Sequence, residues 1–182
     1  MDPEKLFDSV EVLYHSSIRI TGSKTVYFDP FRVEGEPADA DLILITHDHF
    51  DHFSPADIAK VRKAGTALVT PASTAEEAKR LGFPEFHTMA PGDRLEIAGV
   101  TLEAVASYNT NKPNHPKKNN WVGYLLTMDG VRYYVAGDTD DTPEARAVCC
   151  DLALVPVGGT YTLDAAEAAR MVSAMAPKAA VP

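Results

Sequence analysis

Three histidines and two aspartates stand close together in the stretch "LITHDHFDHF", which occupies positions 44–53. His47 and His49 are two positions apart, so on extended backbone their side chains point the same way. Asp51 and His52 follow at the point where the chain must turn. Imidazole nitrogens and carboxylate oxygens together suit metals such as zinc, manganese or iron. The stretch therefore predicts a metal site, because a polar loop with histidines by chance is a weaker explanation for so dense a cluster.

Asp138 and His115, which occur much later in the chain, are further candidate ligands. Asp138 lies in "AGDTD", where a predicted strand ends at a glycine, so its carboxylate should stand at a sheet edge. His115 lies in a polar loop without apolar periodicity, which argues against a histidine packed in the core. Both residues could therefore join the metal site if the fold brings them to the same edge.

Several other polar residues allow more than one interpretation. His15 in "LYHSS" could lie near the site or serve as a hydrogen-bonded structural histidine. Tyr161 follows two glycines in a predicted loop, where its hydroxyl could orient a substrate. Asp29 is expected to fix a turn rather than to bind metal, and no role is expected for His87.

The loop around His115 is basic although the protein is acidic. Lys112, Lys117 and Lys118 surround the histidine, and the formal net charge of the chain is −9. These lysines suggest an anionic substrate, while a solvated loop is the plainer alternative.

The elements that must position these residues form a mixed pattern with more strand than helix. The apolar run at 42–46 predicts a buried strand directly before the cluster. Ser54 as N-cap and Pro55 at the first helical position predict a helix after it. Asp164 and Glu167 form a capping-box pattern for a helix that runs to about position 175. Further strands are expected at 10–14, 17–20, 24–28, 94–97, 100–106, 121–128, 131–135 and 152–157, and a further helix at about 74–81.

Two stretches of the chain resemble each other. A hairpin, "YFDPF" and "ADLILITHDH" occur in the first half, and a hairpin, "YVAGDTD" and "CDLALVPVGG" occur in the second. In both, an Asp-Leu-apolar strand ends in an unusual loop. A true duplication would give two β-rich halves that face each other, with these loops on one shared edge.

Length and composition predict one domain over residues 1–182 with a substantial core, since 45% of the residues are hydrophobic. The acidic charge argues against general attraction to a nucleic-acid backbone. No apolar run approaches the roughly 20 residues that cross a bilayer, and the first residues do not form a signal-peptide pattern. The only cysteines are the adjacent Cys149 and Cys150, which suggest structural thiols and a cytoplasmic location. The sequence leaves a monomer and a homo-oligomer open.

The motif "THDHFDH" resembles the signature of the metallo-β-lactamase superfamily. "YNTNKPNHPKKNNWVGYLL", "YYVAGDTDDTPE" and "DLALVPVGGTYTLDAAEAA" are similar to a bacterial branch of metal-dependent hydrolases related to the ascorbate-phosphate lactonase type. The resemblance covers about positions 12–182. It implies an α/β (α+β) fold, namely a four-layer αββα sandwich built from two similar halves.

The resemblance also implies a ligand set for two metal ions. His47, His49 and His115 would form the first site, Asp51 and His52 would belong to the second, and Asp138 would bridge the two. In the family, a further histidine completes the second site after a late strand. Here "PKAAVP" resembles that strand, and no histidine follows His115. Either this sequence is a truncated form, or three protein ligands and a substitute hold the second metal. The family's closing strand and helix also lack a counterpart, so exposed apolar surface and a weak second site are expected.

The leading interpretation is a hydrolase that uses two cations, most simply Zn²⁺, with Mn²⁺ or Fe²⁺ as alternatives. The cations would hold a bridging water and lower its pKa, so that hydroxide attacks a small ester, lactone or phosphoester, with an anionic substrate as one alternative. Asp51 would orient this nucleophile and take up a proton, with His15 and Tyr161 as further catalytic candidates.

Three alternatives remain open, one of them another hydrolase. A phosphodiesterase or nuclease is disfavoured by the acidic charge and by the lack of a basic domain. A metal-binding protein without catalysis is favoured if the second site is incomplete. A di-iron redox protein would usually carry an added flavin domain, for which 182 residues leave no room.

Overall fold

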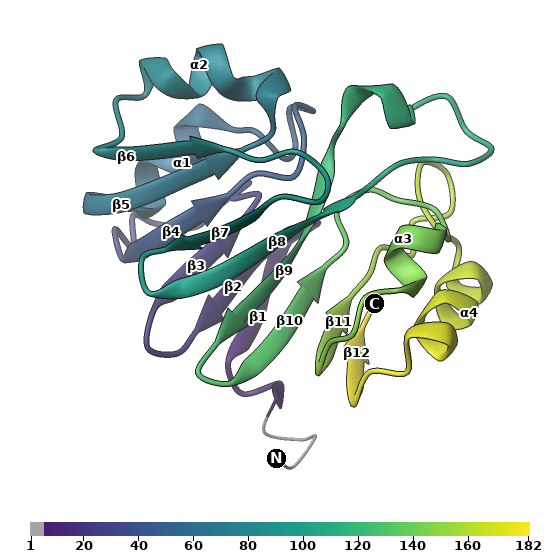
Figure 1. Cartoon of the computed structure of the whole chain (residues 1–182). Coiled ribbons are helices and arrows are strands. Elements are labelled where there is room, and N and C mark those ends of the chain that lie inside the picture. The colour runs from purple at the N-terminus through teal and green to yellow at the C-terminus, as the bar shows by residue number, and fades with distance from the viewer. Residues whose placement is uncertain (1–5) are drawn as a thin grey trace.

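Two six-stranded β-sheets form the centre of the computed structural model, which describes residues 6–182 (Figure 1). Runs of alternating or continuous apolar residues produce these strands, because each sheet must bury at least one face. The first half of the chain builds one sheet and the second half builds the other.

The strands of the first sheet lie in chain order. The first three form an antiparallel meander, and the next three join in parallel. Parallel strands need long connections, and two of these carry helices. The strands are β1 (Val10–Tyr14), β2 (Ser17–Thr21), β3 (Thr25–Phe28), β4 (Ala40–Leu44), β5 (Arg62–Thr70) and β6 (Glu85–Thr88).

The second sheet repeats this plan. Its first four strands are antiparallel neighbours, and the last two pair in parallel with the strand before them. The shared plan agrees with two similar halves. The strands are β7 (Arg94–Ile97), β8 (Val100–Ala106), β9 (Val122–Met128), β10 (Val131–Val135), β11 (Leu152–Leu154) and β12 (Ala179–Val181).

Helices cover the outer face of each sheet (Figure 1). Ile58 in the first helix of the chain packs with Ile43 on the outside of the first sheet. Met171 packs with Tyr134 on the outside of the second. The helices are α1 (Pro55–Val61), α2 (Ala75–Arg80), α3 (Pro143–Arg146) and α4 (Ala165–Met175), with short 3₁₀ segments at Ala72–Thr74 and Lys117–Asn119.

The space between the sheets holds the largest apolar cluster, to which Leu44 and Leu126 both contribute. Neighbouring residues of one strand point to opposite faces, so Ile43 faces the helices while Leu44 faces the other sheet. The layers are therefore helix, sheet, sheet and helix, which confirms the predicted αββα sandwich.

The predicted helix starts are confirmed. Ser54 caps α1 by accepting a hydrogen bond from the backbone N–H of Asp57. Asp164 and Glu167 exchange both hydrogen bonds of a capping box at the start of α4. These caps fix where the chain leaves the loops at the sheet edge.

β5, β6 and α3 were not predicted from the sequence. Only Ala67–Val69 of β5 is continuously apolar, and the strand also contains Gly65, so its pattern is weak. The strand before the histidine cluster ends at Leu44 rather than at Thr46. His47 consequently follows a short extended segment instead of the strand itself.

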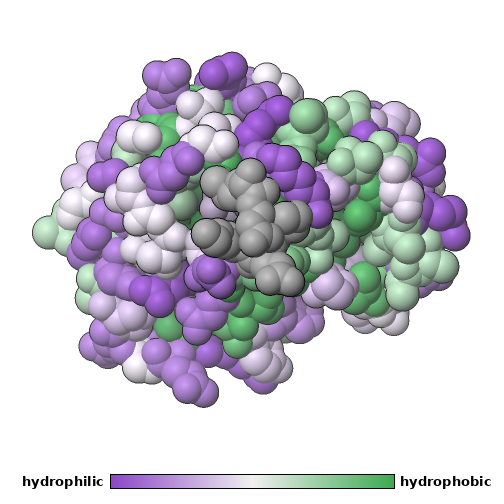
Figure 2. Space-filling model, turned by 90° about the horizontal axis from the view of Figure 1, so that it is seen from below, coloured by the Kyte–Doolittle hydropathy of each residue, from purple (hydrophilic) through white to green (hydrophobic). Residues whose placement is uncertain are grey.

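Apolar side chains reach the surface in places. Val12 and Tyr14 of the edge strand β1 are 48% and 40% exposed. Figure 2, seen from below, shows mostly hydrophilic residues on the left and more hydrophobic surface on the right, on the side of α4. Within residues 6–182, no helix has the length and apolar character needed to cross a membrane.

Candidate metal centre

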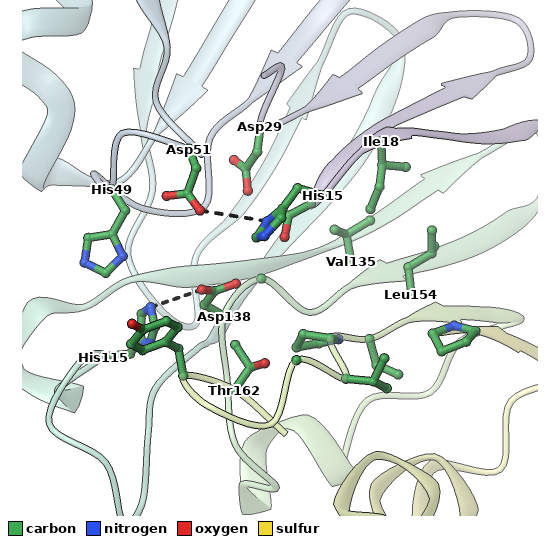
Figure 3. A pocket seen from close by; sticks show the side chains of 18 of the residues that line it. His15, Ile18, Asp29, His49, Asp51, His115, Val135, Asp138, Leu154 and Thr162 are labelled. Atoms are coloured by element: carbon green, nitrogen blue, oxygen red, sulfur yellow. Dashed lines mark ion pairs between the residues drawn. The ribbon is translucent and has the colours of Figure 1, made fainter. Parts of the chain in front are cut away.

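Loops at one edge of the two sheets bring the candidate ligands together. The loop after β4 carries His47, His49 and His52, the β8–β9 connection carries His115, and the loop after β10 carries Asp138. Figure 3 shows His49 and His115 around the same space as Asp138. Residues from distant parts of the chain thus meet because both sheets end at this edge.

His47, His49 and His115 form one group whose ligand atoms all lie within 4.8 Å of one another. Nε2 of His47 and Nδ1 of His49 are 3.0 Å apart. Ligand atoms around a tetrahedral ion with bonds of 2.0–2.1 Å would be about 3.3 Å apart. The spacing is therefore close to what a single ion requires.

Asp138 lies between this group and His52. Its Oδ2 atom is 3.2 Å from Nε2 of His115 and 4.0 Å from Nε2 of His47. Its Oδ1 atom is 3.5 Å from Nε2 of His52, which in turn lies 3.7 Å from Oδ2 of Asp51. The two oxygens of Asp138 face different sets of ligands, as a bridging carboxylate would.

Two nitrogens at this site lack a hydrogen-bond partner although they are buried. They are Nε2 of His52 and Nε2 of His115, and both belong to histidines that are at most 1% exposed. A buried polar atom without a partner costs about 1–3 kcal/mol. Such a cost is removed if the lone pairs coordinate a cation, so the residues present fit a metal centre.

A second layer of hydrogen bonds fixes the histidines after β4. Nδ1 of His52 is 2.7 Å from Oδ2 of the buried Asp29, and Thr46 donates to the same carboxylate from its backbone N–H and its hydroxyl. Nδ1 of His47 is 2.9 Å from the Thr46 hydroxyl. Asp29 therefore directs Nε2 of His52 towards the site, as outer carboxylates do for metal-binding histidines.

Asn109 fixes the orientation of the His115 ring by hydrogen bonds. Its side-chain N–H₂ group donates to Oδ1 of Asp140 and to the backbone carbonyl of Tyr161, which are both acceptors. Its Oδ1 must then accept from the backbone N–H of His115 at 2.9 Å and from Nδ1 of the ring at 3.0 Å. This network places the ring proton on Nδ1 and leaves the lone pair on Nε2 facing Asp138.

The charges suit neutral His47 and His49 beside an ionised Asp138, whereas His52 is charged next to Asp29. Burial and the neighbouring His52 lower the pKa of His47 well below its usual value, and burial and His115 lower the pKa of His49. Burial alone would raise the pKa of Asp138, but the neighbouring His115 and the charge of His52 outweigh it and lower that pKa. Burial alone would also lower the pKa of His52, yet the Asp29 carboxylate raises it to about 9.

The other two catalytic candidates line a cavity of about 840 Å³ beside the cluster. His15 has a positive φ of 55° in the turn after β1, and its Nδ1 atom is 3.8 Å from Oδ2 of Asp51. Tyr161 is 58% exposed and lines the same cavity from the second half of the chain. All predicted site residues thus lie in one region, although their roles stay predictions.

Two of the three lysines of the basic loop are paired with carboxylates. Nζ of Lys112 is 2.6 Å from Oδ1 of Asp140, and Nζ of Lys117 is 2.7 Å from Oε1 of Glu144. Carboxylates therefore neutralise both lysines. Lys112 and Lys117 therefore do not support the expectation that this loop attracts an anionic substrate.

Sequence reasoning missed four residues that support the cluster. Asn109, Thr46 and Asp140 act through hydrogen bonds, and the ring of Trp121 lies 4.9–5.5 Å from the rings of His47, His49 and His115. Nothing in their local sequence pattern marks them. The one available signal was the "AGDTD" motif, in which Asp140 stands two positions after Asp138.

Comparison with known proteins connects this geometry to a family. Residues 9–182 match the family model described as the Beta-lactamase superfamily domain. A metal-dependent hydrolase of Thermococcus onnurineus is 34% identical over 188 residues, which cover 95% of this chain and 82% of that protein. A metal-dependent hydrolase of Nitratidesulfovibrio vulgaris is 34% identical over 191 residues, with 92% and 76% covered.

Solved structures show the same fold. A crystal structure of a protein from Parabacteroides distasonis has a TM-score of 0.80 at 32% identity, and the match covers 94% of this chain and 79% of that one. CmlA, a diiron β-hydroxylase from Streptomyces venezuelae, has a TM-score of 0.73 at 16% identity, with 94% and 43% covered. At that identity the second likeness concerns the fold alone.

Proposed function

The chain belongs to the metallo-β-lactamase superfamily and is a metal-dependent hydrolase, and we propose that it cleaves a small ester, lactone or phosphoester at the centre described above. The observation that carries this proposal is the convergence of three histidines on Asp138, with the unpartnered Nε2 atoms of His52 and His115 directed into the same space. A merely structural cluster would pair these atoms.

We propose that His47, His49 and His115 hold one cation, that Asp51 and His52 hold a second, and that Asp138 contacts both. Zn²⁺ is the simplest occupant, because neutral imidazole and carboxylate are its usual ligands. Mn²⁺ and Fe²⁺ suit the same donors. When bound, the cations would lower the pKa of a water and polarise the scissile bond.

The residues of the chain have separate tasks in this scheme. Asp51 is 23% exposed at its side chain and faces the cavity, so it can orient the attacking water and accept its proton. His15 lies next to Asp51 and could pass that proton to solvent. Tyr161, on the opposite loop, could donate a hydrogen bond to the substrate. The second-layer bonds of Asp29 and Asn109 keep the histidines aligned.

A metal-binding protein without catalysis is the second candidate. It is favoured by the small ligand set at the second position, for which Asp51, His52 and Asp138 are the proposed ligands. Metal content separates the two candidates, since two equivalents per chain support a hydrolase and one supports a binding protein. Cleavage of nucleic acid has no support from the site, and the acidic charge opposes it.

The proposed centre can be tested with two histidine variants. His115→Ala should lower metal content by about one equivalent and abolish hydrolysis of lactones, esters and phosphodiesters by the metal-loaded protein. His87→Ala is the matched control, because His87 lies on β6 away from the cluster and should change neither property. Unchanged metal content in His115→Ala would contradict the proposed ligand set.

Predictions of the substrate and of the cellular location, made from the sequence, are also part of the proposal. A small molecule is the proposed substrate, and the cytoplasm is the proposed location, on the basis of composition and cysteine use. The finer resemblance to the ascorbate-phosphate lactonase type also stays a prediction.

A further inference from the structure

The single tryptophan of the chain, Trp121, packs against three of the candidate ligands. The centroid of its ring lies 5.0 Å from that of His47, 4.9 Å from that of His49 and 5.5 Å from that of His115. The rings of His49 and His115 are steeply inclined to the indole, at 73° and 65°, which is close to the edge-to-face arrangement that aromatic rings favour. One side chain therefore contacts all three histidines of the first proposed metal position.

Hydrogen bonds fix Trp121 from both halves of the molecule. Its backbone carbonyl accepts from the N–H of Ser107, and the N–H of the next residue, Val122, donates to the carbonyl of Thr46, directly before the histidine cluster. Its indole N–H donates to the hydroxyl of Ser73 at 3.2 Å, in the 3₁₀ segment between β5 and α2. Because the side chain is held at its backbone and at its far end, the histidine rings pack against a surface with little freedom to move.

A second cavity lies behind the indole. His49 and His115 line the larger cavity beside the cluster (Figure 3), and Trp121 is not among the described residues that line it. Trp121 instead lines a separate cavity of about 420 Å³, together with Val105 and Tyr108. Since Trp121 is only 6% exposed and contacts the histidine rings, it fills the space between those rings and the second cavity.

We propose that Trp121 is a positioning residue and the rear wall of the metal centre. It holds the rings of His47, His49 and His115 in their ligand orientation and prevents solvent from reaching them through the second cavity. The indole itself is no ligand, because its nitrogen carries a proton and has no lone pair to offer a cation. This inference rests on the proposed function and adds to it a residue that acts on the metal only through the histidines.

Replacement of the indole should shorten the time for which the metal stays bound. Trp121→Ala would join the second cavity to the histidine cluster and remove the surface that fixes the three rings. A ligand that can turn away releases its ion sooner, so cobalt should leave this variant about tenfold faster or more, in line with the 10–100-fold typical for loss of an outer partner. Excess chromogenic chelator measures the release rate, and the cobalt absorption spectrum should change because it reports the coordination geometry.

Two further variants separate this role from general destabilisation. Trp121→Phe keeps an aromatic ring against the histidines but is smaller and cannot donate to Ser73, so cobalt release should be about twofold to fivefold faster with a nearly unchanged spectrum. Tyr108→Ala is the matched control, since Tyr108 is a buried aromatic residue of the same second cavity whose hydroxyl donates to Glu144. Its cobalt release rate should stay within about twofold of the wild type.

The fluorescence of the wild-type chain provides an independent measurement, because Trp121 is its only tryptophan. Cobalt is paramagnetic and quenches an indole at short range. The first equivalent of cobalt should therefore quench the tryptophan emission beyond any change that zinc causes at the same occupancy.

The outcomes separate this inference from the proposed function. If the cobalt spectrum is absent from the wild type, or is unchanged in His115→Ala, the proposed metal centre is wrong. If that spectrum depends on His115 but cobalt does not quench the emission, the inference about Trp121 is wrong while the centre stands. The same holds if Trp121→Ala retains cobalt as long as the wild type, or if Tyr108→Ala releases it equally fast. Should Trp121→Ala fail to fold, a wild-type release rate in Trp121→Phe would overturn the inference.

Discussion

Asp138 is the residue on which both predicted sites depend. Its two oxygens face His115 and His52 respectively, and nearby histidines lower its pKa. Asp138→Asn removes the charge without changing the size of the side chain, so metal occupancy should fall at both positions. Equilibrium dialysis followed by elemental analysis should show the loss.

Two neighbouring aspartates provide graded controls for this variant. Asp140→Asn should have a smaller effect, because Asp140 supports Asn109 but faces no metal ligand directly. Asp141→Asn should have almost none, because Asp141 pairs with Arg146 at the surface. Equal metal occupancy in all three variants would show that Asp138 is the wrong choice.

The adjacent cysteines should differ in reactivity. Burial and the neighbouring Cys149 raise the pKa of Cys150 to about 12, while Cys149 is exposed. The thiolate is the reactive form, so Cys150 should stay protonated and unreactive until the pH approaches 12. A disulfide-exchange reagent at pH 8 should label one thiol per native chain rapidly and the second only after unfolding. Rapid labelling of two thiols would contradict the described burial.

At the scale of elements, the β8–β9 connection is ordered by one buried side chain. Asn109 joins His115, Asp140 and the carbonyl of Tyr161, and it is 8% exposed. Asn109→Ala should weaken the site containing His115 by about 10–100-fold, which is typical for loss of an outer partner. Competition with a chromogenic chelator measures this affinity.

The same loop offers a matched control. Asn111 is exposed, so Asn111→Ala should alter metal affinity by less than twofold. Nitrogen chemical shifts of the metal-free protein provide a second measurement, since Asn109→Ala should release the His115 ring from its Nδ1–H form. A metal affinity that is equal in both variants would contradict the positioning role of Asn109.

The pairing of β9 with β10 leaves no space for a side chain at Gly123. A Cβ atom there would lie 2.6 Å from the carbonyl oxygen of Ala136 and 2.8 Å from that of Val135. Gly123→Ala should therefore lower the free energy of unfolding by about 1–3 kcal/mol or more. Gly65→Ala in β5 is the control, because nothing lies within 4 Å of its Cβ position and its φ is not positive. Urea denaturation of both variants gives the comparison.

The αββα fold was implied by the family resemblance, while the histidine cluster and the helix starts were predicted from local sequence. His47–His52 follow a continuous apolar strand, and the caps at Ser54 and Asp164 depend only on residues within one turn. Asn109 and Thr46 could not be predicted because their partners are set by the tertiary fold. β5 was missed for a related reason, since its pairing with β4 and β6 supplies an order that its own weak pattern does not show.

For the whole molecule, the two metal positions should differ in affinity. In the proposed ligand set, the first position has His47, His49, His115 and Asp138, and the second has Asp51, His52 and Asp138. Dialysis against a mild chelator should therefore remove one metal early while the ion at His47, His49 and His115 persists. Simultaneous loss of both ions would mean that a further ligand completes the second position.

The two halves of the molecule contribute the proposed ligands of one centre: His47 and His49 follow a strand of the first sheet, and His115 and Asp138 lie in loops between strands of the second. A bound ion would thus act as a cross-link that closes a long loop of chain. Cross-links of this kind restrict the conformations of the unfolded chain. A cross-link that closes a loop of many dozens of residues raises the free energy of unfolding by about 4 kcal/mol. Metal removal would then do more than stop hydrolysis. It would loosen the junction between the sheets, so that proteases could enter the loops there before either sheet unfolds.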